Sequence, residues 1–381
     1  MTTKIKIVIG QNLGDEGKGQ VTDYFAYRSY IDGESCLVVL SNGGSQRGHT
    51  VTSQFGKRHV FHHFGSGTFA LAHTYIPEYF VVNPMNFVME YNDIIKSRII
   101  PYVYINPNCK ITTPYDMIAN QMIEESRGNQ RHGSCGIGIW ETILRDGITF
   151  GEMIHKTNPE KADYLRFVRD EYFTNRISNK GIVPNGEWSK IIYSDRLIIN
   201  YIKDLNEMNS RILYANDEIL DDYKSIVFEN GQGLLLDQNI SGYGKHTTPS
   251  NTGLKNPATM INKMHNDVDV EVCYVTRTYI TRHGVGRFDT ECDSDMISSK
   301  IMIDKTNHPN EFQGSLRYGV LDWKSAEERA LKDFEKFGDP DWKISFFFTH
   351  ANECSLPAVY NPHDYRTYIS DNPTRMNVKI I

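Results

Sequence analysis

The chain has few cysteines, and none is spaced for a zinc site or a disulfide scaffold. Its 381 residues contain six cysteines, and no two of them form a Cys-x-x-Cys pair. Such pairs are typical of zinc ligands and redox motifs, and dense cysteines are typical of small secreted domains. We therefore expect reduced thiols in an intracellular protein.

Long apolar runs, internal repeats and an excess of basic residues are also lacking. No stretch is long enough to cross a bilayer, and the polar N-terminus lacks the apolar segment of a signal peptide. The net charge is −6 at pH 7, with Lys and Arg scattered along the chain, so nothing suggests nonspecific binding of nucleic acid. We expect a cytoplasmic protein, in the host cytoplasm if the gene is viral, with no membrane or nucleic-acid partner.

Strand-like and helix-like segments alternate along the chain. Strand-like runs lie at 4–9, 36–41, 225–229, 268–275 and 343–349, and helix-like stretches lie at 115–126, 162–175, 195–209 and 324–337. This alternation predicts an α/β fold whose mostly parallel central sheet is flanked by helices. We expect one domain over residues 1–381, with 128–160 and 176–190 as excursions from its core. Function then belongs at the carboxyl ends of the strands.

A glycine-rich turn follows the first predicted strand. Residues 10–19 read Gly-Gln-Asn-Leu-Gly-Asp-Glu-Gly-Lys-Gly, and the backbone N–H groups of such a turn bind phosphate. The turn is P-loop-like but not a P-loop, because Asn12 stands at the first glycine position and Gly19 replaces the hydroxyl residue. The carboxylates of Asp15 and Glu16 within an anion-binding turn indicate a metal ion or a proton transfer.

A second polar loop follows the next apolar strand. Residues 41–50 read Ser-Asn-Gly-Gly-Ser-Gln-Arg-Gly-His-Thr, and they include His49. Two neighbouring strands thus both end in glycine-rich loops, one with an acid pair and one with a histidine. A turn-capping aspartate and a loop histidine bonded to backbone are the alternative interpretations of Asp15 and His49.

Together these loops resemble those of the adenylosuccinate synthetase family. The first loop of that family reads Gly-Asp-Glu-Gly-Lys-Gly, and its second ends in Gly-His-Thr-Val, as residues 48–51 do here. Four further segments resemble family segments in the same order: residues 229–237, 247–252, 279–288 and 310–322. The resemblance therefore spans residues 4 to about 322 and implies the fold of the family.

The resemblance implies a ligase that joins an amino group to C6 of a purine. In the family, an aspartate removes the N1 proton of a 6-oxopurine, O6 attacks the γ-phosphate of a nucleoside triphosphate, and the amine of L-aspartate displaces the phosphoryl group. Asp15 would be the base, His49 would donate a hydrogen bond to O6 or the phosphate, and Lys18 would neutralise the γ-phosphate. Asp15 and the Gly48 carbonyl would hold Mg²⁺.

The resemblance also assigns binding residues. The substrate nucleotide would contact Asn42, Ser134, Arg145, Gln232 and either Thr247 or Thr248. The nucleoside triphosphate would contact Gly14, Glu16, Gly17, Lys18, Gly19 and Asn352. L-Aspartate would contact Gly314, Ser315 and Arg317. Arg145 aligns with an arginine that reaches the site of the neighbouring subunit, which implies a homodimer; the alternative is a surface helix arginine.

Three departures from the family bear on the substrates. Only four residues separate Phe312 from Arg317, so an arginine that approaches the ribose hydroxyl is missing, which weakens the preference for ribose over deoxyribose. Asn352 stands where cellular enzymes have a guanine-reading aspartate; an amide offers one acceptor and one donor, which favours ATP over GTP. Residues 45–47 read Ser-Gln-Arg in place of Asn-Asn-Ala in a loop that touches the base.

These departures resemble the bacteriophage branch of the family, which condenses dGMP with L-aspartate to make the precursor of 2-aminoadenine DNA. We therefore predict an ATP- and Mg²⁺-dependent ligase acting on dGMP and L-aspartate. One alternative is adenylosuccinate synthetase activity on IMP with GTP. A different class, a P-loop-like kinase or nucleotide-binding regulator, would not consume L-aspartate.

Overall fold

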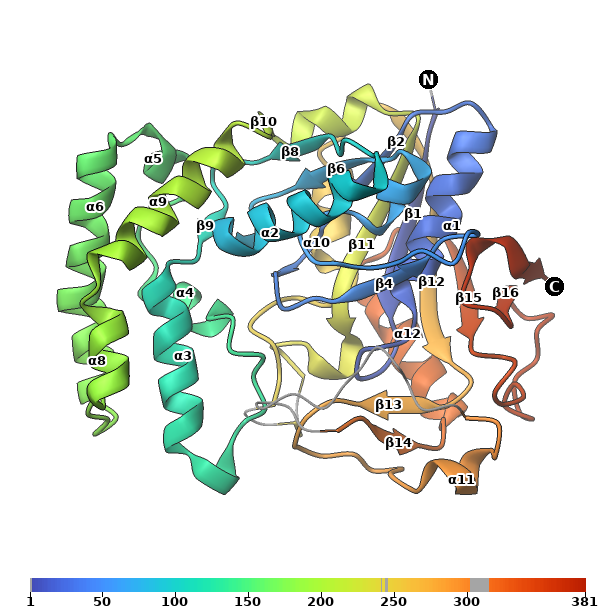
Figure 1. Ribbon diagram of the computed structural model, residues 1–381. Helices are drawn as coiled ribbons and strands as arrows, with labels where there is room; N and C mark the ends of the chain where they lie inside the picture. The colour runs from blue at the N-terminus through green and yellow to red at the C-terminus, as the bar shows by residue number, and fades with distance from the viewer. Residues whose placement is uncertain (1, 241, 244–245, 302–314) are drawn as a thin grey trace.

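A ten-stranded sheet forms the centre of the molecule (Figure 1). The structure is a computed structural model that describes residues 2–240, 242–243, 246–301 and 315–381. The strand order is β10-β8-β6-β2-β11-β1-β12-β15-β16-β17. The strands are β1 (Thr2–Gly10), β2 (Cys36–Val39), β6 (His73–Ile76), β8 (Val103–Ile105), β10 (Leu213–Tyr214), β11 (Ser225–Gly233), β12 (Asp267–Arg277), β15 (Lys343–Thr349), β16 (Arg366–Ser370) and β17 (Val378–Ile380).

Neighbouring strands of this sheet are parallel, except for the antiparallel pair β16–β17. The predicted fold class, α/β with a mostly parallel central sheet, is therefore confirmed. The carboxyl ends of the central strands point down in Figure 1, toward the small sheet of β13 (Ile280–Arg282) and β14 (Arg317–Gly319). The parallel arrangement places the residues that follow β1, β11, β12 and β15 at one edge of the sheet.

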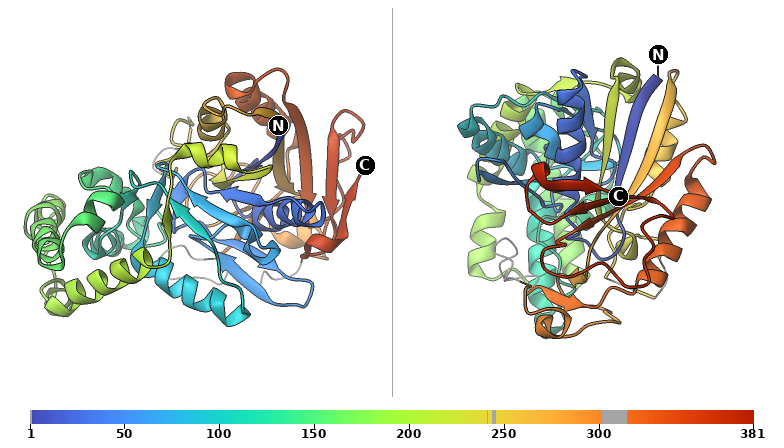
Figure 2. Two further views of the ribbon diagram at one scale, coloured as in Figure 1. Left: turned by 90° about the horizontal axis from the view of Figure 1, so that it is seen from above. Right: turned by 90° about the vertical axis from the view of Figure 1, so that its right-hand side faces the viewer.

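Helices cover both faces of the sheet (Figure 2). Helix α1 (Lys18–Ile31) packs on one face together with Val8 of β1, whereas α10 (Lys255–Ile261) and α12 (Trp323–Phe337) pack on the other with Ile5 and Ile7. Successive side chains of a strand point to opposite faces, so both sets of β1 side chains must be apolar to be buried. Both faces of β1 are buried toward its carboxyl end, which explains the apolar run Ile7-Val8-Ile9, whereas Lys4 and Lys6 alternate with isoleucines nearer its start.

A group of helices stands beside the sheet, on the left of Figure 1. It comprises α3 (Pro114–Ser126), α4 (Ile139–Arg145), α5 (Phe150–His155), α6 (Asn158–Phe167), α7 (Thr174–Ser178), α8 (Gly186–Ile192) and α9 (Asp195–Asn209). A π-helical turn, Val168–Phe173, joins α6 to α7. Residues 128–160 and 176–190 were expected outside the core. Their helices do leave the sheet, yet Phe150 and Met153 are buried in the same hydrophobic cluster as α1.

Shorter elements complete the fold. They are β3 (Gly43–Gly44), β4 (His49–Thr52), β5 (Arg58–Phe61), β7 (Phe80–Val82), β9 (Lys110–Ile111), α2 (Pro84–Ile94) and α11 (Ser294–Ile297), with 3₁₀ turns at Ser66–Ala70, Ile95–Ser97, Gly128–Gln130, Asp217–Asp222, Leu234–Leu236 and Arg375–Asn377. Within the described part of the chain, no helix is long and apolar enough to span a bilayer.

Candidate active site

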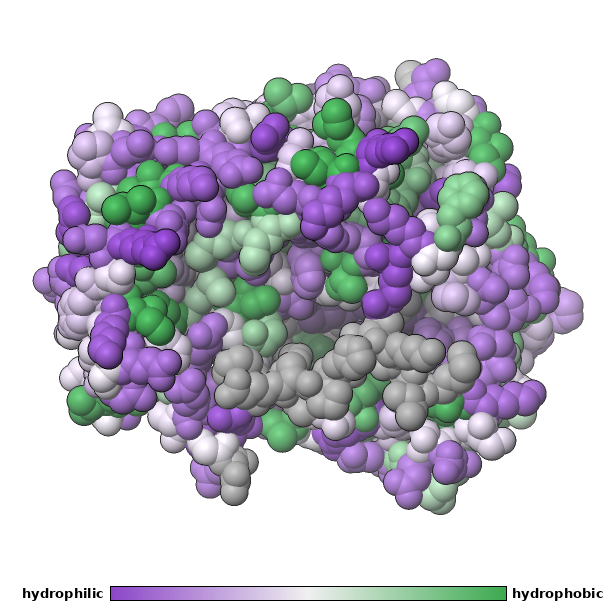
Figure 3. Space-filling view, viewed as in Figure 1, coloured by the Kyte–Doolittle hydropathy of each residue, from purple (hydrophilic) through white to green (hydrophobic). Residues whose placement is uncertain are grey.

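A cavity of about 1230 Å³ opens at the carboxyl edge of the sheet. The face shown in Figure 3 is hollowed over this region. Predicted site residues that line the cavity are Gly14, Asp15, Glu16, Gly17, Lys18, Gly19, Gly48, His49, Ser134, Gln232, Thr247, Thr248 and Asn352. The fold therefore brings the two glycine-rich loops together with segments that lie hundreds of residues further along the chain.

The first loop is organised from within by Glu16. Its Oε1 accepts hydrogen bonds from the backbone N–H groups of Asn12 (3.1 Å) and Gly14 (2.9 Å), and its Oε2 lies 2.6 Å from Nζ of Lys18. Gly10 and Gly233 pack so closely on this carboxylate that a Cβ at either position would lie within 2.6 Å of it. Although Glu16 was predicted to contact the triphosphate, its carboxylate is used inside the loop.

The N-terminus of α1 faces the cavity. The helix begins at Lys18 with Gly17 as its left-handed N-cap, and its first turn carries no acidic residue. Free backbone N–H groups and the helix dipole favour an anion at such a position. Thr349, at the end of β15, donates a 2.7 Å hydrogen bond to the Glu16 carbonyl and thereby holds the loop. The backbone of this turn, next to Lys18, therefore suits an anion such as phosphate.

Asp15 lies at the tip of this loop in a left-handed conformation, with φ of 57°. Its carbonyl accepts a 2.6 Å hydrogen bond from Nε of Arg277, which fixes the backbone. Its carboxylate is 25% exposed and lies 3.5 Å from Nε2 of His283. His283 was not among the predicted site residues, although it lies in the segment 279–288 that resembles the family.

His49 is held by a buried charge pair. Its Nδ1 lies 2.6 Å from Oε1 of Glu229 and 2.9 Å from Nη2 of Arg47, while that guanidinium lies 2.7 Å from Oε2 of Glu229. Burial, reinforced by the charge of Arg47, lowers the pKa of His49 to about 3. Burial alone would raise the pKa of Glu229, but Arg47, His49 and Ser66 together lower it to about 2. The ring is therefore neutral beside an ionised carboxylate.

The neutral ring has a preferred tautomer. One nitrogen cannot both donate to Glu229 and accept from Arg47, and we assign Nδ1–H to the carboxylate because the separation is shorter and charge-assisted. Nε2 is then an acceptor. The predicted donation from His49 to O6 or to a phosphate oxygen requires the ring to take up a proton when the anionic group binds.

Some residues predicted to bind the substrate nucleotide line the cavity, and one is buried behind it. Gln232, with φ of 59°, lines the cavity, and its buried Oε1 has no partner within the described residues. Ser134 also lines the cavity and is bonded to Asn120. Asn42 is buried behind the cavity, where its side chain accepts from the Gly231 N–H at 2.7 Å and donates to Ser250 at 3.0 Å. Asn42 therefore holds the segment 229–237, the glutamine loop, which contains Gln232.

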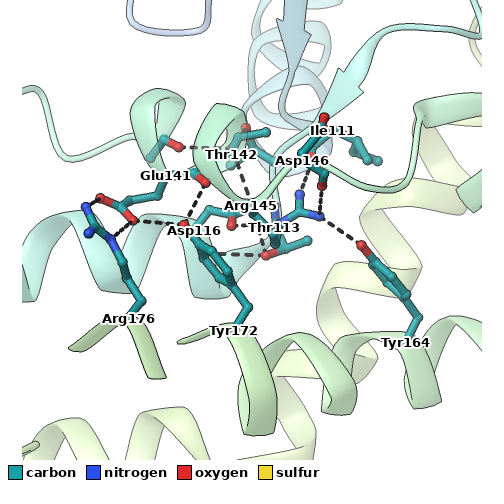
Figure 4. Close-up of polar contacts among 12 residues, drawn as sticks. Ile111, Thr113, Asp116, Glu141, Thr142, Arg145, Asp146, Tyr164, Tyr172 and Arg176 are labelled. Carbon is teal, nitrogen blue, oxygen red and sulfur yellow. Dashed lines mark hydrogen bonds and ion pairs between the residues drawn. The ribbon is translucent and has the colours of Figure 1, made fainter. Parts of the chain in front are cut away.

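Arg145 is enclosed within its own chain (Figure 4). Its Nε lies 2.9 Å from Oδ1 of Asp116, its Nη1 2.8 Å from the Tyr164 hydroxyl, and its Nη2 2.7 Å from the Ile111 carbonyl. The side chain is 4% exposed and does not line the cavity. This is neither the surface placement considered as an alternative nor that of a residue free to reach a neighbouring subunit. The homodimer remains a prediction.

The predicted aspartate-binding residues lie away from the cavity or outside the described residues. Gly314 lies outside them, and Ser315 is exposed. Arg317 pairs with Glu291 through Nε (2.7 Å) and Nη2, and its Nη1 donates to the carbonyls of Gly284 (3.0 Å) and Gly286 (3.1 Å). Neither Ser315 nor Arg317 lines the cavity.

The predicted donor-base residue, Asn352, is exposed and lines the cavity near the C-terminal segment. Asn372 and Pro373 of that segment also line it. Gln20 of α1 ties the segment down, because its Nε2 lies 2.7 Å from Oγ of Ser370 and 2.5 Å from the Asn372 carbonyl. Gln20 therefore joins the start of α1, next to the first glycine-rich loop, to the C-terminal segment that lines the cavity with Asn352.

The predicted metal ligands suit a hard cation. The Asp15 carboxylate and Gly48 both lie on the cavity wall, and carboxylate and carbonyl oxygens are the donors that Mg²⁺ prefers. Within the described chain, no group of three or more His, Cys, Asp or Glu residues is placed to hold a metal. Mg²⁺ is commonly bound by one or two protein oxygens, with substrate phosphates and water as the remaining ligands.

A doubly covered parallel sheet with an anion-binding glycine loop at its carboxyl edge defines a nucleotide-binding α/β protein. The comparison with known sequences is more specific. The sequence profile described as adenylosuccinate synthetase matches residues 7–328. The chain belongs to the adenylosuccinate synthetase family.

Individual relatives agree with this assignment. The adenylosuccinate synthetase of Lactobacillus acidophilus is 30% identical over 291 residues, which are 74% of this chain and 64% of that protein. That of Alkaliphilus metalliredigens is 29% identical over 305 residues, which are 78% of this chain and 67% of that protein. The chain thus spans less than two thirds of the Lactobacillus protein.

Two solved structures share the fold. The fully ligated adenylosuccinate synthetase of Plasmodium falciparum aligns over 99% of both chains with a TM-score of 0.69 at 16% identity. The cyanophage S-2L succinoaminodeoxyadenylate synthetase, PurZ, bound to dGMP and to dATP as energy donor, aligns over 100% of this chain and 96% of that chain, with a TM-score of 0.63 at 14% identity. At these identities the likeness establishes the shared fold.

Proposed function

We propose that this protein is an ATP-dependent ligase that condenses dGMP with L-aspartate. The product is 2-amino-2′-deoxy-N6-succinyladenylate, a precursor of 2-aminoadenine DNA, and ADP and phosphate are released. The observation that carries the proposal is the convergence of Asp15, Lys18 and His49 on one cavity, from two separate glycine-rich loops. A simple kinase or nucleotide-binding regulator has no need of an acid and a histidine on opposing loops.

The chemistry follows from what each side chain can do. Asp15 takes the N1 proton, which makes O6 nucleophilic. As the bond from O6 to the γ-phosphorus forms, the bond from that phosphorus to the β,γ-bridging oxygen breaks and ADP leaves. The amine of L-aspartate then attacks C6, the C6–O6 bond breaks, and phosphate departs with O6 while the amine loses a proton. Lys18 and the N-terminus of α1 stabilise charge on the transferred group.

Mg²⁺ would be held by the Asp15 carboxylate and the Gly48 carbonyl. When bound, it neutralises charge on the transferring phosphoryl group. Asp15 would then serve two functions, as a ligand of the cation and as the base that takes the N1 proton.

The choice of ATP rests on Asn352. A carboxylate accepts both hydrogen bonds that guanine N1–H and N2–H offer, whereas an amide pairs one donor and one acceptor with adenine. The choice of a deoxynucleotide rests on the short loop before Arg317, which lies largely outside the described residues. The cyanophage synthetase, bound to dGMP and dATP, shows that this fold accepts such a pair of substrates.

Adenylosuccinate synthetase activity on IMP with GTP is the second candidate. The names of the bacterial relatives favour it. Both candidates consume one L-aspartate for each phosphate released, which no kinase does. Measuring this ratio with purified protein therefore tests the ligase class: a ratio of one is expected, and phosphate release that is independent of L-aspartate would contradict it.

A further inference from the structure

Arg282 is a buried cation in the cavity wall that has no carboxylate partner among the described residues. It ends β13, and the residue is 3% exposed. Its Nη1 donates to the Arg287 carbonyl (2.8 Å) and its Nη2 to the Val285 carbonyl (3.1 Å), and its guanidinium lies 5.8 Å from the centre of the Tyr243 ring. Its buried Nε has no hydrogen-bond partner in the part of the chain that the structure describes. Carbonyl oxygens do not cancel a full charge, and a buried cation without a counterion is costly.

Several other cations of the same cavity have a carboxylate partner. Lys18 lies 2.6 Å from Glu16, and Arg47 lies 2.7 Å from Glu229. Arg176 pairs with Glu141 at 2.7 Å (Figure 4). The unpaired state of Arg282 is therefore not a general property of this cavity, and it indicates a position that an anionic ligand completes.

Arg317 provides an internal comparison. It lies directly opposite Arg282 in the antiparallel pair of β14 and β13. Arg317 uses its Nε and Nη2 edge to bind the Glu291 carboxylate, and the same edge of Arg282 carries the unpartnered Nε. Burial and the charge of Arg317 both destabilise the charged form of Arg282 and so lower its pKa. An anion bound at this edge would stabilise the charged form.

We propose that Arg282, rather than Arg317, binds a carboxylate of the acidic amino-acid substrate. The inference rests on the proposed function, because it assumes that L-aspartate enters this cavity. Two placements support a carboxylate here. Arg282 precedes His283, which lies 3.5 Å from the Asp15 carboxylate, and β14 directly follows the segment predicted to bind the amino acid. The Nε and Nη2 edge of a guanidinium matches the two oxygens of a carboxylate.

The test is a set of Michaelis constants measured on Arg282→Gln. Loss of a charge-assisted hydrogen-bond pair should raise KM for L-aspartate by about 10- to 100-fold. KM for dGMP and for ATP should stay within about twofold, because the nucleotide contacts are elsewhere. Arg282→Lys keeps the charge without the planar fork and should raise KM for L-aspartate by a smaller factor. If Arg282→Gln does not fold, the KM of Arg282→Lys for L-aspartate still tests the inference.

Arg287→Gln is the matched control. Its side chain lies on the same turn, is 55% exposed and pairs with Asp289, so its loss should leave all three Michaelis constants within about twofold. A raised KM for dGMP with unchanged KM for L-aspartate would assign Arg282 to a phosphate and overturn the inference. So would an effect on L-aspartate in Arg317→Gln but not in Arg282→Gln, or a lowered Tm without a selective change in KM.

Failure of the proposed function appears earlier, in the wild-type protein. If the wild type releases no phosphate in response to L-aspartate, the ligase assignment and the inference built on it both fail. If the wild type is active and Arg282→Gln keeps its KM for L-aspartate, only the inference fails.

Discussion

At the scale of single residues, charge around the cavity is mostly compensated within the chain. Glu16 neutralises Lys18, and Glu229 neutralises Arg47. The Asp15 carboxylate differs, because within the described residues its ion-pair contact is with His283 at 3.5 Å and it stays partly exposed to the cavity. A general base needs this combination of access and an uncommitted oxygen.

Asp15→Asn should therefore lower kcat for aspartate-dependent phosphate release by at least about 100-fold. Asparagine has nearly the same volume and tolerates the left-handed backbone of this position, so the fold should persist. The matched control is Asp32→Asn, an exposed residue just after α1, which should keep kcat within about twofold. Retained turnover in Asp15→Asn would contradict the assigned role.

Asn352→Asp should shift the preferred phosphoryl donor from ATP toward GTP. The carboxylate would accept both N–H groups of guanine, and its repulsion of adenine N1 would weaken ATP. We expect the ratio of kcat/KM values for GTP and ATP to rise by about tenfold or more. Competition assays with both donors measure this ratio, and an unchanged ratio would show that Asn352 does not contact the base.

The residue types of the site could be predicted from the sequence, but their orientations could not. Asp15, Lys18 and His49 line one cavity as the motifs indicated. Glu16 and Arg145 lie in equally suggestive positions, yet both are committed to partners inside the chain. The partners of Arg145 come from other elements, about which a motif carries no information. The partners of Glu16 lie within its own loop, where the motif does not show whether the carboxylate faces the loop or the ligand.

At the scale of helices and strands, Arg145 joins separate elements into one unit. From α4 it reaches Asp116 on α3, Tyr164 on α6 and the Ile111 carbonyl on β9. Asp116 also forms the capping box of α3 with Thr113. The arginine therefore compensates a buried carboxylate on which the start of a helix depends.

Arg145→Met should lower the free energy of unfolding by about 3 kcal/mol or more, because it leaves the Asp116 carboxylate buried without its cation. Urea unfolding measures this change. Arg166→Met is the matched control, since that exposed arginine pairs with Asp163 within α6, and its loss should cost less than about 1 kcal/mol.

A different result would favour a role for Arg145 across a subunit interface. In that case Arg145→Met would keep its stability and lose activity. Activity would then return when Arg145→Met and Asp15→Asn chains are mixed, because one site of the mixed dimer would be complete.

The long elements could be predicted because their patterns are regular. The predicted helix at 195–209 matches α9, and the run at 343–349 matches β15. The predicted helix at 162–175 is instead divided into α6, a π-helical turn and α7. The chain stays helical through the π-helical turn, so a helix-like stretch in the sequence does not show where the turn begins or ends.

At the scale of the whole molecule, a partly buried acid links stability to pH. Asp333 on α12 accepts hydrogen bonds from the Tyr274 hydroxyl and the Leu254 N–H, both at 3.0 Å. Burial raises its pKa from 3.8 to about 6 despite these bonds. The folded protein therefore binds this proton more tightly than the unfolded chain does, and the resulting stabilisation is present below pH 3.8 and lost as the pH rises through 6.

Wild-type stability should accordingly lose a contribution of about 3 kcal/mol from this group between pH 4 and pH 7. Asp333→Asn cannot titrate, so the difference in unfolding free energy between variant and wild type should change by that amount over the same range. Urea unfolding at several pH values measures it. Asp339→Asn, at an exposed position, should follow the wild-type curve, and an equal pH slope in Asp333→Asn would contradict the account.

The order of the sheet could not be predicted, although its parallel character could. Alternating strands and helices indicate parallel pairing, but the insertion of β11 between β1 and β2 joins segments more than 180 residues apart. This pairing brings the glutamine loop against both glycine-rich loops. The cavity is thus a consequence of the complete topology and not of a single motif.

The most direct test of the central claim is a matrix of substrates. Purified protein, Mg²⁺ and L-aspartate are combined with dGMP, GMP or IMP, each with ATP or GTP, and products are followed by mass and by phosphate release. The account predicts a succinylated product from dGMP with ATP and little from IMP. Product from IMP with GTP alone would contradict the assigned substrates and make the protein a diverged enzyme of purine biosynthesis.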